Sequence, residues 1–295
     1  MGGGHPRGLV PVGPRGQQHW PEGHPACGGR SQSPIDIGTG GGAADPSLPP
    51  LRPIGYGRPP AAPFGFANNG HTAVLALPPS LRLGGLPHSF AAAQLHFHWG
   101  RNGGAEHLLD GYRAPAELHV VHYDAERFAN ASQAQHHAAG LAVLGVLLEA
   151  GDEPNPAYDN ILRHLGSIRY AGQATSIPSF SLRGLLPQRL DRYYRYNGSL
   201  TTPPCFQSVL WSVFQEPVLL SRAQLEQLRG SLYATAPDEP EPERLEENFR
   251  APQDLNQRLV LASFSSGEVV AIVFGTVFGC LGLFLAVHFA SKRLR

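Results

Sequence analysis

The chain has 295 residues, with 23 basic and 23 acidic side chains that give no formal net charge, and 42% of its residues are hydrophobic. A chain of this length and apolar content can bury a large core, and the balanced charge argues against a nucleic-acid-binding protein. Its three cysteines are too few for a small disulfide-rich scaffold.

The N-terminal segment, residues 1–18, is rich in glycine, proline and arginine and lacks the apolar core of a secretory signal peptide. We expect this segment to be divergent or disordered, and a single folded domain to cover residues 19–264. Within that domain, residues 38–63 are rich in proline, so we expect them to wrap the surface in an irregular, extended conformation.

Alternating apolar residues and turn signals predict strands along much of the domain. Residues 64–77 alternate and turn at Asn68-Asn69-Gly70, which predicts a strand pair. Further strands are expected over residues 94–99, 117–123, 208–214 and 259–264.

Two segments have patterns that predict helices, and a third is ambiguous between a helix and a strand. Residues 140–148 form a continuous apolar run, which periodicity alone leaves open between a helix and a central strand. Residues 158–168 place four apolar side chains at helical spacing, so we expect a helix there. Ser221 is expected to cap a short helix that carries Leu225 and Leu228.

The C-terminal segment predicts a membrane anchor. Residues 269–290 are apolar and free of Asp, Glu, Lys and Arg, and they are long enough to cross a hydrocarbon core of roughly 30 Å. The tail, residues 291–295, is basic, and basic residues stay on the cytoplasmic side. We therefore predict a single-pass type I protein of the plasma membrane, with its domain outside the cell and residues 265–268 as a short juxtamembrane linker.

The membrane segment also contains a dimerisation signal. Gly275 and Gly279 form a GxxxG pair, which lets two helices approach closely. The sequence therefore allows a homodimer formed through this helix.

Three histidines predict a zinc site. His96 and His98 alternate along a strand and therefore share one face, and His119 lies on the strand that follows a chain reversal. Three histidines with one open position are typical of catalytic zinc, whereas structural zinc is usually closed by four protein ligands. The alternative is that these are ordinary half-buried strand histidines.

Two polar residues accompany these histidines. Gln94 lies two residues before His96, and Glu117 lies two residues before His119, so each shares a strand face with its histidine. A side-chain oxygen in such a position can accept a hydrogen bond from the imidazole and fix its orientation. The alternative is a pair of exposed polar strand residues.

Several motifs occur in one order along residues 19–264, and together they resemble the α-class carbonic anhydrases. They are Gln32-Ser33-Pro34-Ile35-Asp36-Ile37, Asn69-Gly70-His71, Gln94-Leu95-His96-Phe97-His98-Trp99-Gly100, Glu106-His107, Ala116-Glu117-Leu118-His119 and Gly198-Ser199-Leu200-Thr201-Thr202-Pro203-Pro204. Trp20-Pro21 and Asn248-Phe249-Arg250-Ala251 are similar to the transmembrane branch of that family. The resemblance implies an α+β fold, with a large, mostly antiparallel twisted sheet, short peripheral helices and a zinc site in a central cone.

The resemblance implies a role for each matching residue of the site. His96, His98 and His119 correspond to the zinc ligands, with Gln94, Glu117 and Asn248 supporting them. Thr201 corresponds to the hydroxyl that orients the attacking water and donates to Glu106, and Thr202 lines the same side. The apolar wall that holds carbon dioxide corresponds to Val121, Val143, Leu200 and Trp211.

A histidine, a cysteine pair and an asparagine complete the site and its surroundings. His71 corresponds to the proton shuttle, a role that suits histidine because its side chain titrates near neutral pH. Cys27 and Cys205 correspond to a disulfide of the secreted and membrane members, the alternative being two free thiols. Separately, Asn130-Ala131-Ser132 matches the N-glycosylation sequon and makes Asn130 a candidate site.

These residues imply a zinc lyase that converts carbon dioxide reversibly into bicarbonate and a proton at the outer cell surface. Sulfonamide-type anion inhibitors are expected as ligands from the family. The alternative is a catalytically weak, carbonic anhydrase-like ectodomain that acts as a binding or adhesion module. A zinc hydrolase of unrelated fold is disfavoured because the HExxH signature is absent from the sequence.

Overall fold

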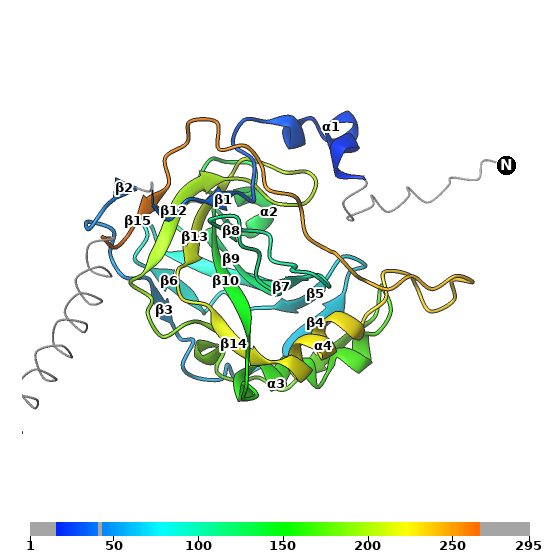
Figure 1. The fold of residues 1–295 in the computed structure, drawn as a ribbon. Coiled ribbons are helices and arrows are strands. Elements are labelled where there is room, and N and C mark those ends of the chain that lie inside the picture. Colours follow the sequence, from blue (N-terminus) through cyan, green and yellow to red (C-terminus); the bar gives the residue numbers. More distant parts are fainter. Residues whose placement is uncertain (1–15, 41–42, 266–295) are drawn as a thin grey trace, which may run out of the picture.

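The computed structural model describes residues 16–40 and 43–265, and one large sheet dominates this part of the chain (Figure 1). Within the described residues the large sheet has 13 strands in the order β11-β4-β5-β7-β9-β10-β13-β12-β15-β2, with β14 beside β10, and with β3 paired to β6 beside β7. The strands are β2 (Ala43–Ala44), β3 (Arg52–Ile54), β4 (Phe64–Asn68), β5 (Ala73–Ala76), β6 (Arg82–Gly84), β7 (Phe90–Trp99), β9 (Ala116–Asp124), β10 (Leu141–Gly151), β11 (Ala174–Ile177), β12 (Tyr193–Gly198), β13 (Val209–Phe214), β14 (Val218–Ser221) and β15 (Leu261–Ala262). A separate pair joins β1 (Asp36–Ile37) to β8 (Leu108–Leu109).

The helices are short and lie around the sheet, with α3 and α4 together at one end and α1 at the other (Figure 1). The α-helices are α1 (Trp20–Gly23), α2 (Ala131–Ala134), α3 (Pro156–Leu162) and α4 (Arg222–Gly230), and the 3₁₀ helices are η1 (Gln17–His19), η2 (Pro25–Gly28), η3 (Leu165–Ile168) and η4 (Leu182–Leu185). Most strand pairs are antiparallel, but β10 runs parallel to β13 and β14, and β15 runs parallel to β2. The sheet is therefore mixed but mostly antiparallel, and the family resemblance implied a mostly antiparallel sheet.

The open question at residues 140–148 is settled in favour of a central strand. Strand β10 covers Leu141–Gly151 and lies between β9 and β13. Its side chains are buried on both sides of the sheet, with Leu144 and Val146 in one apolar cluster and Leu141 and Val143 in another. A strand that is covered on both faces needs apolar residues at every position, which removes the period-2 pattern.

Two predicted elements are shorter than expected. The single helix predicted over residues 158–168 is wrong: α3 ends at Leu162, and a separate 3₁₀ turn covers Leu165–Ile168. Gly166 and Ser167 are poor helix formers, and a tighter turn over them still buries Leu165 and Ile168. The last strand, predicted over residues 259–264, has ladder pairing only at Leu261–Ala262.

Other local predictions are confirmed. Residues 64–77 form β4 and β5, joined by the turn at Asn69 and Gly70. Ser221 caps α4 through a capping box: the Ser221 hydroxyl accepts from the Gln224 N–H at 3.3 Å, and Gln224 Oε1 accepts from the Ser221 N–H at 3.1 Å. Leu225 and Leu228 of this helix are buried, as the spacing indicated.

The described chain begins with residues that already belong to the domain. The Gln17 side chain donates to the Phe249 carbonyl and accepts from the Ala251 N–H, both at 2.9 Å. Residues 1–15, the predicted membrane segment 269–290 and the tail 291–295 lie outside the described residues, as does most of the linker 265–268. None of the helices within residues 16–40 and 43–265 has the length and apolar character needed to span a bilayer.

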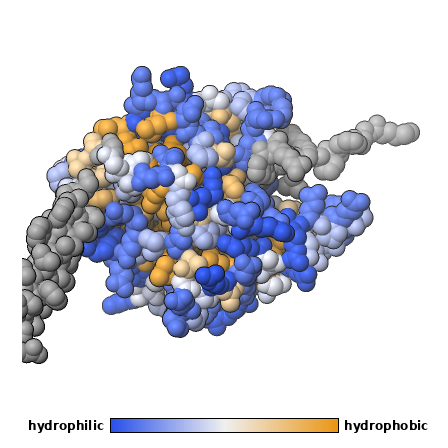
Figure 2. All heavy atoms as spheres, viewed as in Figure 1, coloured by the Kyte–Doolittle hydropathy of each residue, from blue (hydrophilic) through white to orange (hydrophobic). Residues whose placement is uncertain are grey.

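The surface is mostly hydrophilic on the face shown in Figure 2, with apolar side chains gathered in one area at the upper left and a smaller one below the centre. Among the described residues, the large apolar side chains that are exposed are Ile54, Tyr112, Leu219, Leu255 and Leu259. Most large apolar side chains of the described residues are therefore buried, and they pack in two clusters on the two sides of the sheet.

One histidine belongs to this core and not to the predicted site. His122 of β9 is fully buried, its Nε2 lies 2.6 Å from the Tyr56 hydroxyl, and its Nδ1 lies 3.2 Å from the Ala142 carbonyl. The carbonyl can only accept, so Nδ1 carries the proton and Nε2 accepts from Tyr56. Burial lowers the pKa of His122 from 6.5 to about 4.

We expect His122 to make the domain less stable in mild acid. Between pH 6.5 and about 4 the unfolded chain binds a proton at His122 that the folded chain does not, so the unfolding free energy falls as pH falls through this window. The shift corresponds to about 3 kcal/mol of unfolding free energy. His122→Gln keeps a donor and an acceptor but does not titrate, so its urea midpoint should vary less with pH than that of the wild type.

The exposed His136 supplies the control, because His136→Gln should leave the pH dependence unchanged. Equal pH dependence in wild type and His122→Gln would contradict the prediction.

Candidate metal centre

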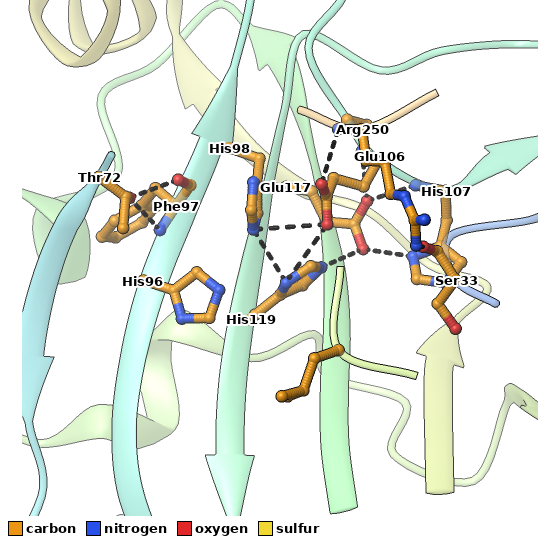
Figure 3. A network of polar contacts seen from close by, with 12 residues as sticks. Ser33, Thr72, His96, Phe97, His98, Glu106, His107, Glu117, His119 and Arg250 are labelled. Atoms are coloured by element: carbon orange, nitrogen blue, oxygen red, sulfur yellow. Dashed lines mark hydrogen bonds and ion pairs between the residues drawn. The ribbon is translucent and has the colours of Figure 1, made fainter. Parts of the chain in front are cut away.

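The three predicted metal ligands lie on two neighbouring strands. His96 and His98 are on β7 and His119 is on β9, and the antiparallel register places His96 directly opposite His119. Alternation along β7 turns Leu95 and Phe97 into the core and leaves the two histidines on the other face. Figure 3 shows the three imidazole rings pointing toward one another, so the structure brings together the residues that the sequence selected.

Each imidazole has a hydrogen-bond acceptor behind it. His96 Nδ1 donates to Gln94 Oε1 at 2.8 Å, as expected from the strand spacing. His98 Nδ1 donates to the Asn248 main-chain oxygen at 2.8 Å, and His119 Nε2 donates to Glu117 Oε1 at 2.7 Å. In a neutral imidazole the other ring nitrogen then has a free lone pair, so each ring turns an unprotonated nitrogen inward.

The inward nitrogens fit a zinc ion. Ligand atoms of His96, His98 and His119 all lie within 4.8 Å of one another, and His98 Nε2 is 3.1 Å from His119 Nδ1. Two lone pairs this close repel each other, and a shared cation would remove the repulsion. Burial lowers the pKa of His96 well below its ordinary value and also lowers that of His98, so both favour the neutral form that metals bind.

Glu117 is the most heavily hydrogen-bonded group behind the site (Figure 3). Its Oε1 accepts from His119 and from His107 Nδ1, each at 2.7 Å, and its Oε2 accepts from the main-chain N–H groups of Glu106 and His107 at 2.8 Å. Burial alone would raise the pKa of Glu117, but His107 and His119 hold it well below its usual range. His107, Glu117 and His119 also lie close enough to hold a cation, but their hydrogen bonds already occupy the atoms concerned.

Glu106 lies beside the metal ligands and is almost completely buried. Its Oε1 accepts from the Arg250 main-chain N–H at 2.8 Å, and its Oε2 lies 3.5 Å from His98 Nε2 and 3.9 Å from His119 Nδ1. Among the described residues, Oε2 has no hydrogen-bond partner. Thr201 is buried as well, and its expected hydrogen bond to Glu106 stays a prediction.

A cavity of about 130 Å³ opens beside the histidines. Its lining includes His71, Val74, His96, His98, Thr202 and Asn248. His71 is half-buried on the turn between β4 and β5, and burial lowers its pKa. Two larger hollows elsewhere on the described surface are lined by neither histidine nor threonine, so they offer no comparable chemistry.

The four residues expected to form an apolar wall do come together. Val121 of β9, Val143 of β10 and Trp211 of β13 form one row across the sheet, because each is the register partner of the next. Leu200 packs against the same apolar cluster. The Trp211 ring lies 4.8 Å from that of His119, which places the row next to the candidate metal site.

The disulfide between Cys27 and Cys205 is present and links η2 to the loop after Thr202. The Cys205 N–H donates to the Thr202 carbonyl at 2.9 Å, so the bond anchors a loop that lines the cavity. Asn130 is exposed, and its side chain caps α2 by accepting from the Gln133 N–H at 3.0 Å. Its glycosylation stays a prediction.

Sequence reasoning missed the connecting residues of the site. His107 Nε2 lies 2.6 Å from the Tyr196 hydroxyl, which in turn is 2.9 Å from the Ser33 hydroxyl. The Arg250 guanidinium donates to the carbonyls of Ser33 and Cys27. Ser33, His107 and Arg250 stood within motifs that carried the resemblance, whereas Tyr196 did not. No spacing rule joins positions so far apart in the chain.

Comparison with known proteins agrees with this geometry. The eukaryotic-type carbonic anhydrase family matches residues 15–264. The chain is 45% identical over 260 residues to carbonic anhydrase 12 of Homo sapiens, covering 87% of this chain and 73% of that protein. It is 41% identical over 256 residues to carbonic anhydrase 6 of Bos taurus, covering 85% and 78%, and 40% identical over 256 residues to carbonic anhydrase 1 of Mus musculus, covering 84% and 95%. On this evidence the chain belongs to the eukaryotic-type carbonic anhydrase family.

Proposed function

We propose that the chain is a zinc-dependent carbonic anhydrase that interconverts carbon dioxide with bicarbonate and a proton at the outer face of the plasma membrane. The observation that carries the proposal is the convergence of three unprotonated imidazole nitrogens beside an apolar row and a small cavity. An uncharged, linear substrate needs a dry surface next to a nucleophile, and this arrangement supplies both.

His96, His98 and His119 would hold the zinc ion, and Gln94, Glu117 and Asn248 keep their rings in place through the hydrogen bonds described above. Zinc in such a site makes a coordinated water acidic enough to ionise near neutral pH, as is known for carbonic anhydrases themselves.

Thr201 and Glu106 are assigned to orientation of the nucleophile. Glu106 Oε2 is a buried acceptor without a hydrogen-bond partner among the described residues, and such an atom is costly unless a donor reaches it. We assign that donor to the Thr201 hydroxyl, whose own oxygen then accepts a hydrogen bond from the attacking water. Val121, Val143, Leu200 and Trp211 hold the carbon dioxide, and Thr202 lines the cavity beside it.

His71 is assigned to proton export. It lies in the lining of the same cavity as His96 and His98, and its ring is half-buried, so it can exchange protons with both the interior and bulk water. Because histidine titrates near neutral pH, it can accept a proton and release it without a large energetic cost.

The location and ligands rest on the sequence and on the family. The apolar residues 269–290 and the basic tail support a single-pass type I orientation, with dimerisation through Gly275 and Gly279. The flanking motifs resemble carbonic anhydrase nine, whereas carbonic anhydrase 12 is among the relatives found, so we assign the transmembrane branch without choosing an isozyme. Sulfonamide-type anions would bind at the metal and fill the cavity.

Stopped-flow hydration of carbon dioxide by the purified full chain tests the proposal, with zinc measured on the same sample. We expect one zinc ion per chain and a rate that falls to the uncatalysed level when a chelator removes the metal. A folded, metal-free and inactive chain would favour the binding or adhesion module instead.

A further inference from the structure

The strap, residues 245–251, connects several parts of the site although it has no regular secondary structure. The Leu245 carbonyl accepts from Trp99 Nε1 at 2.9 Å, and Glu247 Oε1 accepts from the Arg101 N–H at 2.7 Å. Farther along, the Arg250 N–H donates to Glu106. The strap therefore lies across the end of β7, directly beside the metal ligands.

Asn248, at the centre of the strap, uses its main chain and its side chain for different partners. Its main-chain oxygen accepts from His98 Nδ1 at 2.8 Å. Its side-chain Nδ2 donates to the His71 carbonyl at 2.9 Å and to the Phe97 carbonyl at 3.1 Å, and its Oδ1 accepts from the Trp99 N–H at 2.8 Å. Two carbonyls and one N–H fix the orientation of the amide, because only the nitrogen can donate.

The turn that carries His71 has further contacts, both within itself and to β7. The Thr72 hydroxyl donates to the Phe97 carbonyl at 2.6 Å and accepts from the Phe97 N–H at 3.1 Å (Figure 3). Asn69 Oδ1 accepts from the N–H groups of His71 and Thr72, each at 2.9 Å, and Gly70 has the positive φ of 86° that such a turn requires. His71 Nδ1 is buried without a hydrogen-bond partner among the described residues. The position of the ring therefore depends on the main chain that carries it, and Asn248 holds that main chain at the His71 carbonyl.

We propose that Asn248 is a positioning residue for proton transfer, whose side-chain amide holds the His71 turn against β7 while its main-chain oxygen orients His98. This inference rests on the proposed hydration activity. The two tasks are separable, because Asn248→Ala removes the amide but leaves the main-chain oxygen in place.

The experiment compares the zinc-loaded full chain with Asn248→Ala. In dilute buffer, where proton export limits turnover, we expect kcat to fall about tenfold, a part of the 10²–10⁴-fold that a general acid–base group contributes. We expect kcat/KM for carbon dioxide to change by less than about twofold, since it does not include proton export. Added imidazole buffer should restore kcat, and in a His71→Ala background Asn248→Ala should have no further effect.

Hydrogen exchange on the metal-free chain gives a readout that does not need activity. Asn248→Ala should accelerate exchange over residues 69–72. Glu246→Gln is the matched control. Glu246 lies on the same strap, and this substitution removes only its ion pair with Arg101, so it should alter neither exchange nor kcat. If Asn248→Ala does not fold, Asn248→Ser is measured in the same way.

Three results would overturn the inference: an equal fall in kcat and kcat/KM, a loss of zinc, or unchanged exchange over residues 69–72. The first two would mean that the amide serves the metal site. A wild-type chain without hydration activity would instead refute the proposed function, and the exchange measurement would still show whether Asn248 holds the turn.

Discussion

Replacing His96 with alanine is expected to remove the metal and abolish carbon dioxide hydration while the fold is retained. Under the proposed function His96 would supply one of three nitrogen ligands, and its partner Gln94 accepts a hydrogen bond from that ring. Loss of an outer partner of a ligand typically lowers metal affinity by 10–100-fold, so loss of the ligand itself should lower it by more than roughly 100-fold.

The fold should survive because the imidazole of His96 is outside the apolar core. Its neighbours Leu95 and Phe97 are buried on the opposite face of β7, and the main-chain pairing with Val74 and His119 does not involve the side chain. We therefore expect an unchanged circular dichroism spectrum from a zinc-free, inactive variant.

The measurement combines zinc content, stopped-flow hydration and circular dichroism on one sample. His19→Ala is the matched control, because the His19 side chain is 60% exposed and contacts only surface groups. A His96→Ala chain with full zinc and full turnover would mean that the metal is held elsewhere.

The convergence of the three candidate metal ligands could be predicted from the sequence because the relevant geometry is local. Alternation along a strand places His96 and His98 on one face, and a chain reversal brings His119 opposite them. The same rule found Gln94 and Glu117, which precede their histidines by two residues. The sequence therefore contains most of the metal site within two short segments.

The connections to the site could not be predicted in this way. Asn248 contacts His98 across 150 positions and His71 across 177, and no periodicity links such residues. The position of Glu106 Oε2 beside His98 and His119 likewise depends on packing that becomes visible only in three dimensions. Tertiary contacts, not local preference, determine these details.

The secondary structure shows the same division. The helix cap at Ser221 and the turn at Asn69 are local, and both were predicted. The strand β10 remained ambiguous because a fully buried strand and a buried helix have the same continuous apolar run. Only the neighbours of β10 on both sides decide between the two.

Removing the disulfide is expected to lower the free energy of unfolding more than any other substitution described above. The bond joins Cys27 and Cys205 across a separation of 178 residues. Constraining so long a loop in the unfolded chain stabilises the fold by about 5 kcal/mol in the chain-entropy model, against a total of roughly 5–15 kcal/mol for a typical domain. The double variant Cys27→Ser/Cys205→Ser should therefore unfold at a much lower urea concentration, as measured by circular dichroism.

Treatment with a reductant distinguishes the effect of losing the disulfide from any effect of the serine side chains. Dithiothreitol should lower the urea midpoint of the wild type to that of the double variant and leave the double variant unchanged. The third cysteine, Cys280, belongs to the predicted membrane segment, so Cys280→Ser should behave as the wild type does. The cavity should also respond, because the Cys205 N–H holds the Thr202 carbonyl at 2.9 Å and Cys27 is held by Arg250 at 3.1 Å. At temperatures where the double variant is still folded, its kcat/KM should be lower than the folded fraction alone explains. Equal midpoints in oxidising buffer would show that the packing around Trp20 holds this loop without the bond.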